Sequence, residues 1–456
     1  MQLDLTRGDI RIHIRTLAVP ASIGFFFHTM FNVTDTYFAG GVSTQALAAL
    51  TLSFPIFFMI ISLAEGMSEA VTALAGNAIG SGDHEAARHI AANALFFGAL
   101  LAAVLSVAGY AAAPWLMREL GAEGSYLAEA LAYINIIILG TGLFVFTFFI
   151  NALLNAVGDT VSFRNVLIFA ALINVLLDYW FVRGGLGIDA MGVSGIALAT
   201  VLIEAMSVAY LFYRFRSKPL YARRTAFRLD AAVFQALIGQ GIPPSANLAL
   251  MAVGIYIITY FAAPFGQEVI AAYGVGMRIE QIILMPAVGL NVAVLAIVAQ
   301  NNGGRLYQRI EETIVRSLLY GGIVSVIGGV LLLAGAEALM RLFGDNADVV
   351  REGALYLRVE AFIIFPFVVI FTYVAMLQGI KRPAFIFYIS VARQVIAPLI
   401  VLSILAWAGF GVLSVWLGIA GIVTAAALIT YRYARRELAS FRDSGSPPLA
   451  KEPFHI

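Results

Sequence analysis

The second half of this chain repeats the first half in rewritten form, at an offset of about 223 residues within a length of 456. The residues that correspond between the halves are Pro20 and Pro243, Ser22 and Ser245, Gly66 and Gly289, Asn77 and Gln300, Gly80 and Gly303, and the stretches 185–188 and 409–412. A repeat of this length in a hydrophobic chain is typical of membrane proteins built from two pseudo-symmetric lobes. The repeat therefore predicts two halves of the same fold.

The composition predicts an integral membrane protein. Hydrophobic residues make up 61% of the chain and charged residues 12%, with a mean hydropathy of +0.90, whereas a soluble domain averages about 25% charged residues. The net charge of +1 gives no basis for nucleic-acid binding. The absence of cysteine excludes disulfides, thiol nucleophiles and cysteine-ligated zinc.

Lysine occurs only at Lys218, Lys381 and Lys451. None of the three follows a GxxxxG loop, so the sequence lacks a nucleotide-binding P-loop. We therefore expect no cofactor, and any transport must draw on an ion gradient or on a partner.

Twelve apolar runs, each about 20 residues or longer and so able to cross a bilayer, alternate with polar turns. We expect membrane-spanning helices near residues 13–38, 46–76, 89–113, 126–151, 163–182, 191–214, 232–262, 268–299, 310–335, 350–377, 384–407 and 412–433. The fold class is therefore all-α, with six helices in each lobe. The expected divisions are an N-lobe at 1–214, a polar interlobe linker at 215–229, a C-lobe at 230–436 and a tail at 437–456.

Basic residues indicate which side of the membrane each connector occupies. Most of the 28 Lys and Arg residues lie at the termini and on the connectors after even-numbered helices. Because cytoplasmic connectors carry the excess of positive charge, both termini are predicted to be cytoplasmic. Six is an even number, so both lobes enter from the same side and are related by an axis along the membrane normal. Residues 444–456 are expected to be disordered.

Two acidic residues lie inside predicted helices of the first half. Asp35 is near the outer end of the first helix, and Asp178 is near the outer end of the fifth, one turn after Asn174. His28 and Asn32 precede Asp35 at spacings that put all three on one helix face. A carboxylate inside the membrane costs about 2.5–3.5 kcal/mol, so it must face a wet cavity, pair with another group or hold a proton.

The two carboxyl groups are compatible with more than one chemistry. They could share a proton and release it when a cation arrives, since burial and a second carboxylate both favour the protonated form. Their oxygens, with the amide oxygen of Asn174, could instead coordinate Na⁺, which is a hard ion. A structural alternative is that each acid caps a helix end at the headgroups, and this suits Asp178 better than Asp35. The residues alone leave these alternatives open.

Pro20 lies fifteen residues before Asp35 in the same predicted helix. A proline within a helix removes a backbone hydrogen bond and permits a kink. Protonation of Asp35 could then change which bend the helix prefers, with Pro20 as the hinge. A static packing kink explains the proline equally well, because Pro243 occupies the corresponding place in the second half.

The twelve helices in two repeats, Pro20 with Asp35 in the first helix, and Asn174 with Asp178 in the fifth together resemble the multidrug and toxic compound extrusion (MATE) family. The resemblance covers residues 10–436 and is strongest to the DinF-like branch. It implies export of amphipathic, often cationic drugs in exchange for H⁺, or less readily Na⁺, by a multi-pass protein of the bacterial inner membrane. We expect a monomer surrounded by membrane lipid.

The resemblance also implies a set of coupling residues. It assigns the cation site to Asp35, Asn174 and Asp178, joined by Tyr133 in the fourth helix. A hydroxyl group from the sixth helix is expected as well, and both Ser194 and Thr200 are candidates for it.

Acids of the second lobe distinguish the NorM-like branch of that family, which carries them on helices seven and ten. Here residues 232–262 contain no acid, and helix ten has Glu360 beside Arg358 near its beginning. With Arg278, Glu280 and Arg393, these two residues predict a structural charge network, while a role in substrate gating is the alternative.

The substrate cavity has its own candidates. Glu65 and Glu69 are one turn apart in the second helix and could attract cationic substrates, or they could mark a break in a long helix. Asn151 in the fourth helix, with His28 and Asn32 in the first, could line the cavity.

Two rival functions fit the sequence less well than drug export. A lipid-linked precursor flippase of the same superfamily would need basic residues for a pyrophosphate, and the apolar runs of the first lobe contain none except near their ends. An intramembrane aspartyl protease would need a GxGD motif within a helix, whereas the nearest string, GLGID at 185–189, has one residue too many and falls in a connector. We therefore expect a transporter and not an enzyme.

Overall fold

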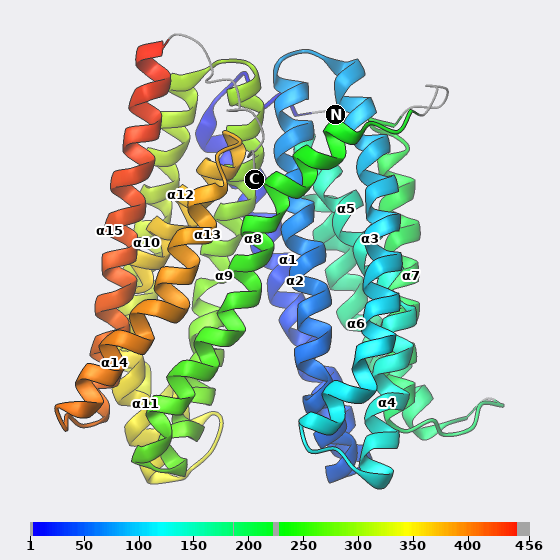
Figure 1. Ribbon diagram of the computed structural model, residues 1–456, viewed down its shortest axis with the longest axis vertical. Helices are drawn as coiled ribbons and strands as arrows, with labels where there is room; N and C mark the ends of the chain where they lie inside the picture. The colour runs from blue at the N-terminus through cyan, green and yellow to red at the C-terminus, as the bar shows by residue number, and fades with distance from the viewer. Residues whose placement is uncertain (1–2, 186, 222–227, 445–456) are drawn as a thin grey trace. The chain divides into compact units, whose positions relative to one another are not determined.

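The computed structural model describes residues 3–185, 187–221 and 228–444 (Figure 1). Part of the expected linker, 222–227, and the end of the expected tail, 445–456, lie outside the described residues. The regular elements of the described chain are all helices, accompanied by one isolated bridge between Gly185 and Ile188. The all-α prediction is therefore confirmed.

In the described chain, ten helices are each long and apolar enough to cross a membrane, and two further spans are formed by pairs of helices. The elements are α1 (Ile10–Val42), α2 (Thr44–Gly80), α3 (His84–Glu119), α4 (Gly124–Leu139), α5 (Thr141–Ala156), α6 (Val161–Arg183), α7 (Val193–Phe215), α8 (Ala231–Ala262), η1 (Ala263–Phe265), α9 (Gln267–Gly303), α10 (Tyr307–Arg341), α11 (Ala347–Glu360), α12 (Ile364–Gly379), α13 (Ala384–Val391), η2 (Ala392–Ile396), α14 (Ala397–Trp407) and α15 (Val412–Ser444). Each of the twelve predicted spans corresponds to one helix or to one group of consecutive helices, so the predicted twelve-helix fold is confirmed.

Two of the spans are broken near their middle. α4 and α5 meet at Gly140 with a bend of 43°, and α11 and α12 meet across residues 361–363 with a bend of 51°. The two breaks occupy corresponding positions of the repeat. At Gly140 a Cβ atom would lie 2.6 Å from Cγ2 of Val201 on α7, so this approach of α7 requires glycine. The sequence predicts one uninterrupted helix for each of these spans.

The described chain forms two compact units whose boundaries lie inside helices. The first unit contains Leu3 and Ile23–Ser245, and the second contains Asp4–Ser22 and the described residues from Ala246 onward. α1 therefore contributes its beginning to the second unit and its remainder to the first. α8 does the converse, at the corresponding position of the repeat.

The beginning of α1 is fixed to the second unit by the segment that precedes it. Leu5 is fully buried, and its N–H donates to Oε1 of Gln300 (3.1 Å). Its carbonyl accepts hydrogen bonds from Nδ2 of Asn301 (3.0 Å) and Nη2 of Arg309 (3.1 Å). Nη1 of Arg309 also donates to the carbonyl of Gly8 (2.9 Å). These bonds tie the segment to the end of α9 and the start of α10.

Each unit has its own apolar core. In the first unit α2, α3 and α5 pack around Phe97 and Phe149, whose rings stack 6.4 Å apart. In the second unit Tyr273, Tyr356 and Trp416 form an aromatic cluster between α9, α11 and α15, with ring centroids 5.1–5.5 Å apart. Aromatic pairs at these distances add to the stability that burial provides.

An ion-paired carboxylate joins the turn between α5 and α6 to the end of α7. Asp159 Oδ2 lies 2.6 Å from Nζ of Lys218 and 3.6 Å from Nη2 of Arg214. The N–H and Oγ of Ser162 also donate to the carboxylate, at 3.0 and 2.9 Å. Burial raises the pKa of Asp159, but the hydrogen bonds from Lys218 and Ser162 outweigh it and hold the pKa below its ordinary value.

We expect Lys218→Met to lower the free energy of unfolding by about 1.5–3 kcal/mol at pH 7, the usual worth of a hydrogen bond to a charged group. Because the pKa of Asp159 is lower in the folded than in the unfolded protein, this stability is present above the unfolded pKa of about 3.9 and is lost as the pH falls through the folded pKa. Denaturation of the purified protein in detergent at pH 7 and near pH 3 measures both effects.

Arg216→Met is the matched control for Lys218→Met. Arg216 is exposed at the same end of α7, and its cation–π partner, the ring of Tyr221, is 6.0 Å away. An equal loss of stability in both variants, or a loss for Lys218→Met that persists unchanged at low pH, would contradict the assignment.

Candidate functional site

Three helices of the first unit bring the predicted cation-site residues together. α1 supplies Asp35, α6 supplies Asn174 and Asp178, and α7 supplies Thr200. Nδ2 of Asn174 donates to Oδ1 of Asp35 (2.8 Å), and Oγ1 of Thr200 donates to Oδ2 of the same carboxylate (3.4 Å). All four side chains are buried, with exposed fractions between 0% and 7%. The cluster is therefore an enclosed polar site within membrane-spanning helices.

The two carboxyl groups of the cluster have different surroundings. Both oxygens of Asp35 accept hydrogen bonds from neutral donors, one from Asn174 and one from Thr200. Both oxygens of Asp178 are buried without a donor from the described residues. The charge of Asp35 acts on Asp178, and two neighbouring buried carboxyl groups favour a single shared proton, because two like charges in an enclosed site are costly.

Tyr133 on α4 stands beside this cluster. Its side chain is buried, with 8% exposed, and the charges of Asp35 and Asp178 both act on it. Its hydroxyl makes no hydrogen bond to either acid. The structure therefore puts Tyr133 at the edge of the site, within the reach of its electrostatic field.

Other predicted site residues lie outside the hydrogen-bonded cluster. Ser194 is half-buried near the start of α7 and has no hydrogen bond to the described residues, so the hydroxyl that reaches Asp35 belongs to Thr200. His28 and Asn32 are exposed, and Nδ2 of Asn32 donates to the His28 carbonyl within α1 (2.9 Å). They share the helix with Asp35 but not its buried environment.

The remaining cavity candidates are on α2 and α5. Glu65 and Glu69 are half-buried, and α2 continues through both positions, so the predicted alternative of a helix break at this point is wrong. Asn151 is buried on α5, and its Oδ1 has no partner among the described residues. These three side chains have no hydrogen bond to Asp35 or Asp178.

Sequence reasoning missed a second carboxylate contact in the first unit. Oγ1 of Thr147 on α5 donates to Oε2 of Glu204 on α7 (2.7 Å), one helical turn after Thr200. In the sequence, Thr147 and Glu204 lie in two separate apolar runs, and nothing in either run indicates that the two side chains are in contact. This bond holds α5 to α7 next to the cluster.

The predicted charge network of the second unit has other partners than expected. Oε2 of Glu280 accepts from the hydroxyl of Tyr356 (2.7 Å), and Glu360 is buried close to the same tyrosine. Nη2 of Arg358 pairs instead with Oε1 of Glu337 (3.0 Å). Within the described residues, Arg278 and Arg393 form no ion pair, but the charges of Arg393 and Glu280 act on one another, as do those of Glu280 and Glu360. The predicted network is therefore found in part, without Arg278 and Arg358.

The repeat, the membrane-spanning helices and the buried carboxylate cluster define a membrane transporter, not an enzyme. The chain belongs to the MatE family, because the profile of that family matches residues 20–180 and 243–402, which together make up most of its length. The predicted membership is therefore confirmed, and one of the two matched segments lies in each half of the repeat.

Individual relatives agree with this assignment over nearly the whole chain. The chain is 25% identical to a probable multidrug resistance protein, NorM, of Thermotoga maritima, covering 90% of this chain and 89% of the relative. It is 27% identical to a FAD transporter of Shewanella oneidensis, covering 83% and 84%. A transporter of the MOP superfamily from Pyrococcus furiosus has the same fold, with a TM-score of 0.90, 23% identity and coverage of 96% and 98%.

Proposed function

We propose that the protein exports amphipathic, cationic drugs from the cytoplasm in exchange for protons, and that Asp35 and Asp178 form the proton site. The observation that carries the proposal is the pair of buried carboxyl groups in one enclosed cluster, close enough for the charge of Asp35 to act on Asp178, with donors from the described residues to Asp35 only. Several similar proteins bear the name of multidrug resistance proteins. Both termini are cytoplasmic in this proposal, as the distribution of basic residues indicates.

The hydrogen bonds of the site support a definite arrangement of the proton. Asn174 and Thr200 donate to Asp35 and so stabilise its charged form, whereas Asp178 has no donor to stabilise a charge. The shared proton therefore belongs on Asp178, from which it can be donated to Asp35. Loss of that proton leaves two like charges in contact inside the membrane, and this repulsion is the force that can change the conformation.

Na⁺ is the alternative coupling ion at Asp35, Asn174 and Asp178. The same donors argue against it, because an N–H or O–H aimed at a carboxylate oxygen repels a cation that approaches the same oxygen. A Na⁺ site would require Asn174 to turn its Oδ1 toward the acids. Oδ1 of Asn174 is buried and has no donor among the described residues, so a flipped amide is the specific change that would favour Na⁺.

The position of Pro20 supports α1 as the moving element. The boundary between the compact units falls between Ser22 and Ile23, two residues after this proline. Proline removes one backbone hydrogen bond of the helix, so α1 can bend near the place where it passes from one unit to the other. A change of charge at Asp35 can therefore be relieved by a bend near Pro20.

Transport by proteoliposomes tests the proposal. With imposed gradients of pH or of Na⁺ applied separately, we expect ethidium to be transported in response to the pH gradient alone. In this proposal Glu65 and Glu69 on α2 line the substrate cavity, where their acidic side chains would favour such a cation over an anion. Including FAD as a second cargo tests the alternative suggested by one relative's name. Transport driven by the Na⁺ gradient alone would assign the same residues to a metal-ion site. If neither ethidium nor FAD were transported, the proposed function would be contradicted.

A further inference from the structure

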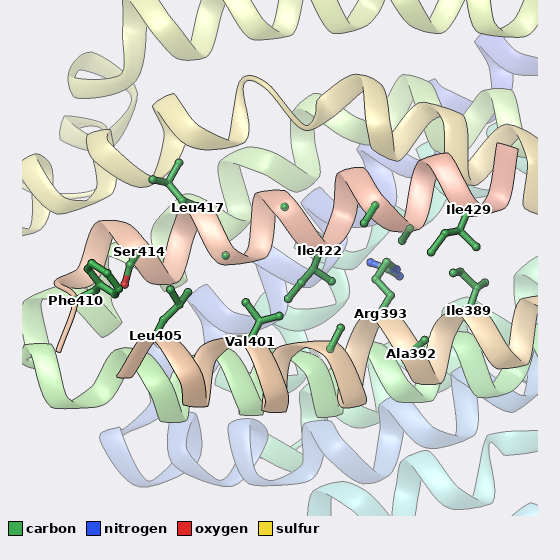
Figure 2. Close-up of a pocket in the computed structure, with 15 residues that line it drawn as sticks. Ile389, Ala392, Arg393, Val401, Leu405, Phe410, Ser414, Leu417, Ile422 and Ile429 are labelled. Carbon is green, nitrogen blue, oxygen red and sulfur yellow. The ribbon is translucent and has the colours of Figure 1, made fainter. Parts of the chain in front are cut away.

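A long apolar groove runs between the last two membrane spans of the second unit. One wall is formed by α13, η2 and α14, the other by α15, and the cavity between them has a volume of about 700 Å³. Figure 2 shows the two helical walls, with side chains such as Val401 and Leu405 on one wall and Ile422 on the other directed into the space between them. The groove is open to its surroundings, since Leu417 and Ile429 in its lining are 54% and 51% exposed. Apart from Arg393 and Ser414, its lining residues are apolar.

Arg393 is the charged residue of the groove. It is carried by η2, a π-helical segment between α13 and α14, and its guanidinium lies in the space between the two walls (Figure 2). A π-helical turn inside an α-helical span is uncommon and is frequently found at functional sites. The irregular segment thus presents a cation to a surface that is otherwise made of hydrocarbon.

Arg393 has no anionic partner within the described part of the chain. It forms neither a hydrogen bond nor an ion pair there, and its aromatic contact is the ring of Phe367, 5.9 Å from the guanidinium carbon. The acid whose charge acts on it is Glu280, and Oε2 of that acid accepts the hydroxyl of Tyr356 instead. An arginine inside a membrane is costly unless its charge is matched, so its donors are available to an external anion.

We infer that this groove binds an acidic membrane phospholipid, with a phosphate oxygen pair on Arg393 and one acyl chain along the groove. A guanidinium group matches the geometry of phosphate with two parallel hydrogen bonds. From Arg393 to Leu405 the wall rises by about 18 Å at about 1.5 Å per residue, so the groove beyond Arg393 is long enough to hold an extended acyl chain. Charge and length therefore fit the same occupant.

Glycine on the facing wall gives a way to close the groove without disturbing the helices. A Cβ atom on Gly421 would meet no other atom within 4 Å, so a larger side chain there would extend into the open groove. Gly418, one turn earlier, is different, because its Cβ would lie 2.9 Å from Cδ1 of Leu405. Gly421→Leu is therefore the variant that fills the groove, and it leaves Arg393 in place.

Native mass spectrometry of the full-length protein tests the inference. Detergent-solubilised protein is mixed with phosphatidylglycerol, with phosphatidylcholine of the same chains, or with oleate. We expect selective retention of one phosphatidylglycerol, weakened about 10- to 100-fold by Arg393→Gln, as for the loss of a charged hydrogen-bond pair. Gly421→Leu should weaken the binding of phosphatidylglycerol as well. Arg393→Lys should retain part of this binding, because lysine keeps the positive charge but lacks the paired N–H donors of the guanidinium group.

Arg278→Gln is the matched control, since Arg278 is an exposed cation within α9 of the same unit. It should leave retention of phosphatidylglycerol unchanged. Equal losses in Arg278→Gln and Arg393→Gln would mean a diffuse attraction between charges and would overturn the site. Undiminished binding by Gly421→Leu, equal retention of phosphatidylcholine, or retention of oleate in place of the phospholipid would each overturn it too. A size-exclusion profile like that of the native protein is required of every variant.

Discussion

Asp35→Asn is expected to abolish proton-driven drug export while leaving the protein folded. Asparagine has nearly the same shape as aspartate, and its Oδ1 can still accept the hydrogen bond that Asn174 now gives to Asp35. It carries no charge, so loss of the proton from Asp178 would no longer leave two like charges side by side, and the repulsion proposed to change the conformation would be absent. We therefore expect export of ethidium in proteoliposomes under a pH gradient to fall on the order of a hundredfold or more, the scale seen when a proton-transferring side chain is removed.

A second variant separates proton exchange from simple damage to the site. Asp178→Asn places an amide donor where the proposed proton sits, so it should imitate the protonated state permanently. Ethidium binding to this variant should then lose its dependence on pH, although binding itself persists. Glu204→Gln is the matched control in the same unit, because the hydroxyl of Thr147 can still donate to the amide oxygen. Normal export by Asp35→Asn, or loss of export in Glu204→Gln alone, would contradict the assignment of Asp35.

The sequence was sufficient to predict the acids of the site but not all of their partners. Asp35 and Asp178 stand out because carboxylates inside apolar runs are rare, and Asn174 is one turn from Asp178 on α6. Ser194 and Thr200 are six residues apart on α7, so they face different directions from the helix axis at 3.6 residues per turn. Thr200 reaches Asp35 because of the angle at which α7 is rotated about its own axis relative to α1. Helix periodicity shows which residues of α7 share a face, but it does not show which face is turned toward α1.

Local sequence signals also explain which features of the fold were missed. The lengths of the apolar runs predict the spans because the bilayer has a fixed thickness. The break at Gly140 depends on the close approach of Val201 from another helix, and glycine is frequent in membrane helices that do not break. The π-helical segment at Ala392–Ile396 is followed by Pro398, which has no N–H and crowds the carbonyl of Gln394 four residues earlier. A local signal for an irregularity was therefore present there, whereas the break at Gly140 depends on contact between distant segments.

The unit boundaries inside α1 and α8 depend on a pair of glycines that correspond in the repeat. Gly289 on α9 faces the beginning of α1, and a Cβ atom there would lie 2.6 Å from the carbonyl oxygen of Ala18 and would collide with the side chain of Ser22. Gly66 on α2 faces α8, where a Cβ atom would collide with the backbone of Ser245. Backbone atoms cannot move aside cheaply, so each helix crossing requires glycine.

Gly289→Ala is therefore expected to destabilise the protein by about 1–3 kcal/mol, the usual cost of an added methyl group in a packed core. It should also reduce drug export, because the displaced part of α1 is next to Pro20, where the bend is proposed. Gly66→Ala should have a similar effect through α8. Thermal unfolding in detergent and ethidium export in proteoliposomes measure the two consequences.

Gly274→Ala provides the control on the same helix as Gly289. A Cβ atom on Gly274 would meet nothing within 4 Å, so this substitution should stabilise α9 slightly, by up to about 1 kcal/mol, as alanine does in a helix that has room for it. The opposite signs expected for two identical substitutions on α9 test the packing directly. Equal stability of the two variants would mean that α1 does not depend on Gly289, and the position of the unit boundary would then need another cause.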